Sequence, residues 1–231
     1  MTFLIRNVID KIDFFYHQRK IFKVLKGLNL KVAIDIGAHK GEFLSYLLKL
    51  DNIEKIYAFE PQIKIFNELV SKFSSNKKVV LNNFAISHES GNKIIKINKL
   101  TSTSTFSEIS EKSLWFKLKN IILLSQNSID DSYQVATQKL DTYIQEKNIH
   151  NIDLLKIDTE GHEINVLNGL ENTLKKQTIK YILIEINLTK MYKNYNVKEI
   201  ENFLKEKKFT LINSFKFPIL NFEDRLYAKQ N

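Results

Sequence analysis

The chain has no cysteine and no apolar stretch of the roughly 18 residues that a membrane-spanning helix needs. The lack of cysteine excludes disulfides and thiolate metal sites, and it fits a reducing compartment. The first residues, Met1–Asp13, contain acids and lack the small-residue cleavage site of a signal peptide. Together these absences predict a cytoplasmic protein.

The sequence also lacks a dense basic run interleaved with aromatic residues. Its formal net charge is +9, and basic charge can indicate nucleic acid, anionic lipid or an anionic substrate as partner. Here the lysines are scattered through the chain, as on a solvated, mildly basic surface. We therefore expect no nucleic-acid partner.

The length of 231 residues suits one α/β domain with a small appendage. Apolar strands alternate with amphipathic helices, which predicts a mostly parallel, seven-stranded sheet with helices on both faces and an antiparallel strand at its end. A hairpin-like piece is expected from Phe84–Ser87 and Lys93–Asn98. The expected strands of the main sheet are Lys31–Ile36, Lys55–Glu60, Lys78–Asn83, Asp153–Asp158, Tyr181–Ile186, Phe209–Phe215 and Arg225–Lys229.

Two segments stand outside this alternation. Apolar residues recur at helical spacing over Phe3–Leu25, and the opposite face is basic. Residues 1–30 are therefore predicted to form a basic, amphipathic helical appendage to the main domain at 31–231. Packing on that domain, peripheral membrane contact and homodimer contact remain open. Residues 98–138 are long for a connection and predict a lid or an acceptor-binding insert, with a helix at 108–124.

The most informative segment is Val32–Leu44, which reads V-A-I-D-I-G-A-H-K-G-E-F-L. It predicts a strand, a tight turn with Gly37 and Gly41, and a helix. The next strand ends at Glu60. This arrangement can hold an adenosine-type cofactor, because Gly37 lets the backbone approach the ligand and Glu60 can bind both ribose hydroxyls.

The details of the turn favour one cofactor over another. A dinucleotide site is expected to read G-x-G-x-x-G, whereas here Ala38 replaces the middle glycine. Asp35 stands where a pyrophosphate would arrive, and its carboxylate would repel that group. The same carboxylate suits the amino group and sulfonium of S-adenosylmethionine, which we predict in preference to NAD. Taken alone, the turn is also consistent with an ordinary strand-to-helix connection capped by its aspartate.

A longer pattern lies at Leu154–Glu163, which reads L-L-K-I-D-T-E-G-H-E and is followed by V-L-N-G at 166–169. It resembles the FkbM-type methyltransferases, whose signature is K-I-D-x-E-G-x-E before a V-L-x-G helix. The resemblance extends over about 32–187 and departs from the family at His39, often Asn there, and at His162, commonly a small residue. It implies a class I methyltransferase (Rossmann-like) fold, S-adenosylmethionine as methyl donor and oxygen methylation of a sugar or related hydroxyl.

Methyl transfer to a hydroxyl needs the reactants aligned and a base for the proton. The carboxyl ends of parallel strands meet at one crevice, so Asp158, Glu160 and Glu185 are expected to lie on one rim. We predict Asp158, Glu160 and His162 as catalytic candidates, in that order of importance. The cofactor is expected at Asp35, Gly37, Ala38, Gly41, Glu60, Pro61, Ala85 and Asp158.

Each catalytic candidate has a structural alternative. Asp158 and Glu160 could cap the helix that follows them, and His162 could be an exposed residue of its first turn. Glu163 is expected to make a structural hydrogen bond, and Asp141 to cap a helix. The acids and His162 include ligand types for a divalent ion, but their spacing does not require one, and no metal is predicted.

The sequence therefore predicts an S-adenosylmethionine-dependent methyltransferase that acts on a sugar, a nucleotide sugar or another polar small molecule, in glycan or natural-product biosynthesis. The alternatives are a silent S-adenosylmethionine-binding scaffold and a methyltransferase for nitrogen or phosphoryl oxygen.

Overall fold

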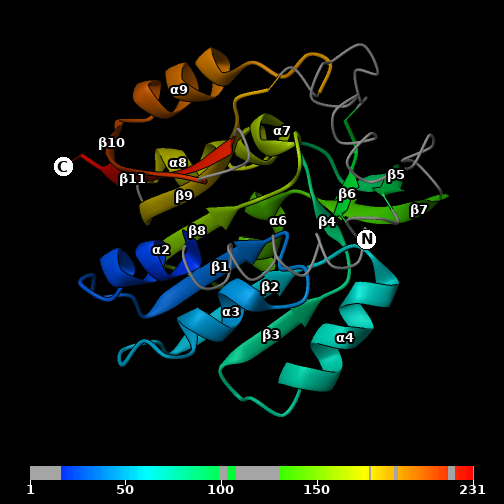
Figure 1. Ribbon diagram of the computed structural model, residues 1–231, viewed down its shortest axis with the longest axis horizontal. Helices are drawn as coiled ribbons and strands as arrows, with labels where there is room; N and C mark the ends of the chain where they lie inside the picture. The colour runs from blue at the N-terminus through cyan, green and yellow to red at the C-terminus, as the bar shows by residue number, and fades with distance from the viewer. Residues whose placement is uncertain are drawn as a thin grey trace.

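The computed structural model describes residues 17–98, 103–107, 131–176, 178–189, 192–217 and 222–230. The helix expected at 108–124 and the first 16 residues lie outside these ranges. In the described part, a central sheet runs in the order β10-β11-β9-β8-β1-β2-β3 (Figure 1). Its strands are β1 (Val32–Ile36), β2 (Lys55–Phe59), β3 (Val79–Asn82), β8 (Ile152–Ile157), β9 (Ile179–Asn187), β10 (Phe209–Lys216) and β11 (Phe222–Lys229).

The sheet has the predicted strand directions. β1, β2, β3, β8 and β9 pair in parallel, whereas β11 runs antiparallel to both β9 and β10. All six residues of β8 are buried, as expected for a central parallel strand covered on both faces. The predicted mostly parallel, seven-stranded sheet with a terminal antiparallel strand is confirmed.

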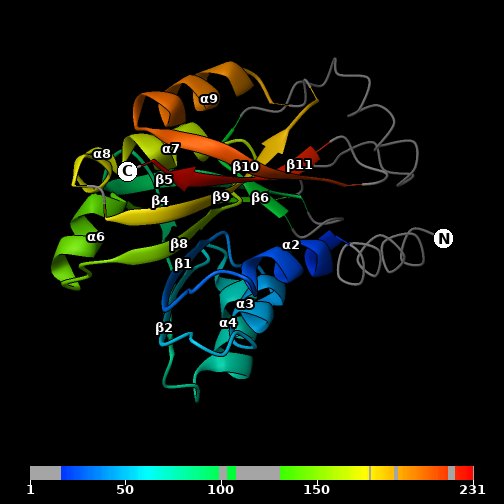
Figure 2. The same cartoon turned by 90° about the vertical axis from the view of Figure 1, so that its left-hand side faces the viewer.

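Helices cover both faces of the sheet (Figure 2). Alternation along β8 sends Leu154 into one hydrophobic cluster and Leu155 into the other. The cluster around Leu154 includes residues of the first three helices, and the cluster around Leu155 includes residues of the last four. The helices are α2 (Gln18–Leu25), α3 (Glu42–Leu47), α4 (Ile63–Phe73), α6 (Leu140–Glu146), α7 (Glu163–Asn168), α8 (Glu171–Lys175) and α9 (Val197–Glu206).

The described part of the N-terminal segment is packed on the domain. Ile21 and Leu25 of α2 are 1% exposed and share a cluster with Ala33 and Leu154 of the sheet. Among the described residues, no helix is both long and apolar enough to cross a membrane.

A second sheet runs in the order β4-β7-β5-β6. The expected hairpin between 84–87 and 93–98 is wrong, because β7 lies between β4 and β5 and pairs with both. Seven residues of β5 pair antiparallel with β7, a far longer ladder than the two residues of β4 could provide. Much of this sheet lies in the segment predicted as an insert. Its strands are β4 (Ala85–Ile86), β5 (Gly91–Asn98), β6 (Thr103–Thr105) and β7 (Asp131–Gln138).

Candidate active site

The site lies where β1, β2, β8 and β9 end, and its first part is the β1–α3 turn. The backbone N–H groups of Gly37 and Ala38 both donate to the Phe59 carbonyl, at 3.0 and 2.9 Å. The His39 N–H donates to Glu60 Oε2 at 3.0 Å, and the Gly41 N–H donates to the Ala38 carbonyl. These four donors are satisfied within the protein, so they cannot also cradle a pyrophosphate. The turn therefore disfavours a dinucleotide, in agreement with the argument from Asp35.

Gly37 is required by a contact that the sequence did not reveal. Its φ is +83°, and a Cβ there would lie 1.8 Å from the Asp158 carbonyl oxygen. A glycine at this point lets the ends of β1 and β8 approach closely. Gly41 has the same φ, and a Cβ there would meet the ring of Phe73 on α4 at 2.3 Å.

Glu60 is held rigidly at the end of β2. The side chain is 3% exposed, and besides the bond from His39 its Oε1 accepts the Gln62 N–H at 2.8 Å. Burial raises the pKa of Glu60 to about 7, although these hydrogen bonds and His39 oppose the rise. Each carboxylate oxygen has two acceptor sites, so Glu60 keeps capacity for two further donors such as ribose hydroxyls. Pro61 follows it, half-buried, and Ala85 is buried on β4.

Asp35 is fully buried and faces a lysine of the protein. Neither of its oxygens is hydrogen-bonded within the described part of the chain, and Lys156 Nζ lies 3.6 Å from Oδ1. Burial raises the pKa of Asp35, and the charge of Lys156 opposes that rise. The expected cofactor residue Asp35 is thus placed behind Lys156 and not on an open surface.

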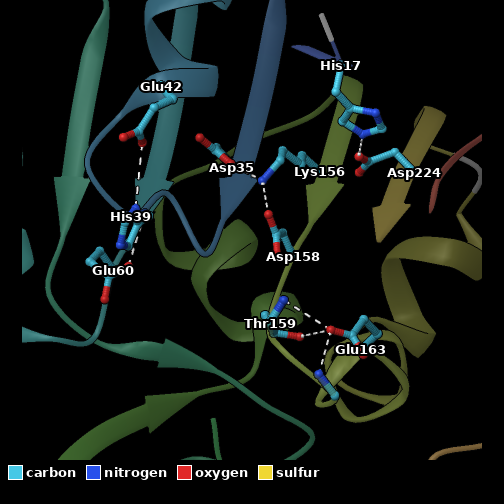
Figure 3. Close-up of polar contacts among 11 residues, drawn as sticks. His17, Asp35, His39, Glu42, Glu60, Lys156, Asp158, Thr159, Glu163 and Asp224 are labelled. Carbon is cyan, nitrogen blue, oxygen red and sulfur yellow. Dashed lines mark hydrogen bonds and ion pairs between the residues drawn. The ribbon is translucent and has the colours of Figure 1, made fainter. Parts of the chain in front are cut away.

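Lys156 is the centre of a buried ionic cluster (Figure 3). It is 4% exposed, its Nζ donates to Asp158 Oδ2 at 2.9 Å, and it lies 5.2 Å from the centre of the Phe43 ring. Burial alone would lower its pKa, but the nearby carboxylates of Asp158, Asp35 and Asp224 raise it, so the ammonium stays charged. Sequence reasoning gave Lys156 no role, although a lysine within an otherwise apolar strand was a usable signal.

The far side of the cluster reaches the N-terminal helix. His17, at the start of α2, shares a 2.7 Å hydrogen bond with Asp224 on β11, and both side chains are buried (Figure 3). The segment expected as an appendage therefore contributes a residue beside the site.

The second part of the site is the β8–α7 turn. Glu160 has a φ of +51°, which is uncommon for a non-glycine residue, and Gly161 has a φ of +95°. A Cβ on Gly161 would lie 2.6 Å from the ring of Tyr192, and the Tyr192 hydroxyl donates to the Glu160 carboxylate. Glu163 accepts bonds from Thr159 and from the Gly161 N–H, which confirms its predicted structural role.

Hydrogen bonds from β6 and the residues just after it also hold this turn. The Thr105 hydroxyl donates to the Glu160 carbonyl and the Ser107 hydroxyl donates to the Gly161 carbonyl, both at 2.6 Å. Three separate segments, at 105–107, Glu163 and Tyr192, thus hold residues 160–161, and this constraint allows the left-handed conformation to persist.

His162 does not match either interpretation made from the sequence. It is 5% exposed, its Nε2 lies 3.0 Å from the Ser87 hydroxyl, and its Nδ1 lies 3.1 Å from the Asn165 amide nitrogen. Because that amide can only donate, Nδ1 accepts and the ring proton is on Nε2. Burial lowers the pKa of His162 to about 3. We therefore correct the prediction: His162 is a buried, neutral, fully bonded residue, neither exposed nor suited to act as a base.

Glu185 joins Asp158 at the carboxyl edge. Ile157 pairs with Ile184, so Glu185 stands level with Asp158, and it pairs in turn with Asp224 on β11. Burial, followed by the charges of Asp158 and Glu160, raises the pKa of Glu185 well above its usual range. Asp141 caps a helix as predicted, but the helix is α8 and not its own, through bonds to the N–H groups of 172 and 173. Within the described ranges, no group of three or more His, Asp or Glu side chains could hold a metal ion.

Three solved structures share this fold. The methyltransferase domain of bacterial CtHen1-C is 10% identical, with a TM-score of 0.54 and coverage of 93% of this chain and 97% of that one. TrmK of M. capricolum, in complex with S-adenosyl-homocysteine, is 15% identical with a TM-score of 0.51 and coverage of 91% and 68%. A Clostridium thermocellum structure named as an rRNA-methylase is 13% identical with a TM-score of 0.50 and coverage of 93% and 97%. A search of curated proteins found no significant match.

The fold is that of the class I methyltransferases, which use S-adenosylmethionine. Residues 35–211 match the family described as the methyltransferase FkbM domain. The chain belongs to this family, as its sequence motifs predicted, and it is an S-adenosylmethionine-dependent methyltransferase.

Proposed function

We propose that the chain methylates a hydroxyl oxygen of a sugar, free or nucleotide-linked, or of another polar small molecule. The observation that carries this proposal is the row of carboxylates at the ends of β8 and β9, formed by Asp158, Glu160 and Glu185. Carboxylates accept hydrogen bonds, and a polyhydroxylated acceptor offers several O–H donors. The same negative charges would repel the phosphates of a nucleic acid at the transfer point.

The residues present fit the cofactor. The adenosine is assigned to the β1–α3 turn, with its ribose on Glu60, because this buried carboxyl keeps free acceptor sites and the N–H groups of Gly37, Ala38, His39 and Gly41 are already bonded within the protein. The positively charged end is assigned to the side of Asp158, whose cluster with Asp35 and Lys156 carries one net negative charge. When bound, S-adenosylmethionine supplies a methyl group on a positively charged sulfur, which an oxygen nucleophile can displace.

The carboxylates of the row take different roles. Lys156 holds Asp158 in one orientation through its hydrogen bond to Oδ2, so Asp158 orients the acceptor. Glu160 is engaged by Tyr192 and lies on a constrained backbone, which suits it to a second positioning contact. Glu185, whose pKa is raised by burial and by its acidic neighbours, is a stronger proton acceptor than an ordinary carboxylate once it is ionised, and it takes the hydroxyl proton. Asp158, predicted as the most important catalytic candidate, is kept as a positioning residue, and Glu185 takes the role of base in place of Glu160 or His162.

The test is a methyl-transfer screen of nucleotide sugars, free sugars and glycans, read by mass spectrometry, with structured RNA as a comparison acceptor. We expect transfer to a sugar hydroxyl, and we expect Glu185→Gln to lower the single-turnover rate by roughly a hundredfold, the scale of general-base catalysis. Glu54→Gln, at an exposed ion pair with Lys31, is the matched control and should leave the rate unchanged.

Two outcomes would contradict the proposal. Transfer to RNA with none to hydroxylated small molecules would overturn the acceptor class. Tight S-adenosylmethionine binding without transfer to any acceptor would favour the silent scaffold.

A further inference from the structure

His39 lies in the β1–α3 turn, and its imidazole can donate and accept hydrogen bonds, but the proposed mechanism gives it no role. Its φ is +46°, a left-handed conformation that few non-glycine residues adopt. The backbone at His39 is fixed by its N–H bond to Glu60 Oε2. A strained residue held in place at a ligand-binding turn is a reason to look for a function of its side chain.

The imidazole of His39 has one nitrogen with a partner and one without. Its Nδ1 lies 3.7 Å from Glu42 Oε2, and Figure 3 shows the ring between Glu42 and Glu60. The Nε2 atom is buried and has no hydrogen-bond partner among the residues that the structure describes. Burial alone would lower the pKa of His39, but the hydrogen bond and charge of Glu42, with a contribution from Glu60, raise it, and Lys40 opposes them. A buried polar atom without a partner is unfavourable, and a ligand is one way to satisfy it.

We propose that His39 is a cofactor-binding residue that shares the adenosine ribose with Glu60. The inference rests on the proposed placement of the ribose at Glu60. A carboxylate can only accept hydrogen bonds, so Glu60 takes the hydroxyl protons and leaves the hydroxyl oxygens without donors. His39 Nε2 lies in the same turn and supplies the missing partner. The contact therefore uses the protonated ring, in which Nδ1–H faces Glu42 and Nε2–H donates to the hydroxyl oxygen.

A binding role and a structural role of His39 predict different changes in melting temperature and in affinity for S-adenosylhomocysteine. His39→Gly removes the ring, and glycine adopts a positive φ without strain. We expect its melting temperature to equal or exceed that of the original chain, while calorimetry shows S-adenosylhomocysteine binding weakened by about fivefold to tenfold. His39→Asn keeps a side-chain hydrogen-bonding group and tolerates the left-handed backbone, so it should recover part of the affinity.

Lys208→Gly is the matched control. Lys208 is also a non-glycine residue with positive φ, +61°, but it lies between α9 and β10. Its replacement should change the melting temperature in the same direction as His39→Gly and leave the affinity for S-adenosylhomocysteine unchanged.

Ligand analogues identify the contact directly. The 2′-deoxy and 3′-deoxy forms of S-adenosylhomocysteine each lack one ribose hydroxyl. If His39 binds one of these hydroxyls, the original chain loses affinity for that analogue and His39→Gly loses little more, because the two changes remove the same bond. Full additivity for both analogues would overturn the assignment.

A variant of Glu60 distinguishes this inference from the placement on which it rests. If Glu60→Gln weakens binding and His39→Gly does not, the ribose site stands and the role of His39 is wrong. If neither variant changes the affinity, the ribose does not lie at Glu60, and both the placement and the inference fail.

Discussion

The two turns at the carboxyl edge of the sheet share a left-handed backbone conformation but are closed by different sets of hydrogen bonds. Each holds a half-buried, non-glycine residue in the left-handed region, His39 in the β1–α3 turn and Glu160 in the β8–α7 turn. The first turn is closed mainly by the next strand of the chain, since its N–H groups donate to the Phe59 carbonyl and to Glu60 at the end of β2, and only the bond to Ala38 lies within the turn. The strand–turn–helix–strand motif of the sequence contains both parts of this arrangement.

The β8–α7 turn is closed largely by residues that are distant in the sequence. The hydroxyls of Thr105 and Ser107 donate to its carbonyl groups. Tyr192 packs on its glycine and donates to its carboxylate, and only the partner Glu163 is local in the sequence. Two more charged groups lie beside the turn, Lys156 on β8, two residues before Asp158, and Glu185 on the neighbouring strand β9. The cofactor side of the site is thus built from two consecutive strands and the helix between them, whereas the proposed acceptor side is assembled from segments more widely separated in the sequence.

The largest expected effect comes from the point where the two turns touch. Gly37→Ala would place a Cβ 1.8 Å from the Asp158 carbonyl at a positive φ, and we expect a loss of at least about 4 kcal/mol of unfolding free energy, or failure to fold. Gly91→Ala is the control, because its φ is +151° but no atom lies within 4 Å of the added Cβ. It should cost roughly 1 kcal/mol in the same urea titration. Equal losses in both variants would show that the turns are not coupled through this contact.

Removal of Lys156 tests the ionic cluster between the turns. Lys156→Met leaves Asp35 buried with an uncompensated charge, and breaking such a pair costs about 3–5 kcal/mol. Lys180→Met is the control, since Lys180 pairs with Asp153 but is 61% exposed, and we expect a loss of about 1 kcal/mol or less. The double variant Lys156→Met with Asp35→Asn should recover most of the stability.

The pH dependence of Lys156→Met has a defined sign. Burial already raises the pKa of Asp35, and the loss of Lys156 removes the charge that opposes this rise. A carboxyl whose pKa is higher in the folded chain binds more protons there, so folding gains stability as the pH falls. The deficit of the variant relative to the original chain should therefore shrink between neutral and acidic pH. A constant deficit would show that Asp35 does not carry the cost.

A smaller effect is expected from Glu60, on the cofactor side. Its pKa is about 7 in the free protein, and ribose hydroxyls bind the ionised form. S-adenosylhomocysteine should bind roughly tenfold more weakly at pH 6 than at pH 8, because the proton must first be released. Glu60→Gln should abolish this difference, leaving only what the ligand's own amino group contributes. An identical pH profile in both proteins would remove Glu60 from the ribose site.

Glu60 also gives a prediction for stability: replacing it should weaken ligand binding but stabilise the free protein at pH 8. The pKa of Glu60 is raised by folding, so its burial costs increasing free energy as the pH rises through about 7. Glu60→Gln should therefore raise the melting temperature at pH 8 and have little effect at pH 5. A lower melting temperature at pH 8 would mean that the bonds from His39 and Gln62 outweigh the cost of burial.

The difference between the turns also explains what could be predicted from the sequence. Apolar strands that end in turn residues gave β1, β2 and β8 within one residue at each end, and their alternation with helices gave the sheet. The role of Glu163 followed from its place just after a turn. These features depend on neighbours in the sequence.

The errors concern contacts between distant segments. β7 was not predicted, because its pairing with β5 and β4 depends on residues about forty positions away. His162 was predicted as a catalytic candidate or an exposed first-turn residue, because nothing near it in the sequence indicates Ser87 or Phe106 as neighbours. Lys156 was passed over, because its two carboxylate partners come together only when β1 lies beside β8.

The central claim is that the first turn binds the adenosine of the donor and that the carboxylates at the ends of β8 and β9 activate the acceptor. The most direct test measures two quantities for Glu60→Gln and Glu185→Gln side by side: S-adenosylmethionine affinity by calorimetry, and the single-turnover rate at saturating donor with the acceptor found in the screen. We predict that Glu60→Gln weakens affinity by about tenfold with little change in saturated rate, and that Glu185→Gln lowers the rate by roughly a hundredfold with little change in affinity. The same pattern in both variants, or the reverse assignment, would contradict the division of the site between the first turn and the ends of β8 and β9.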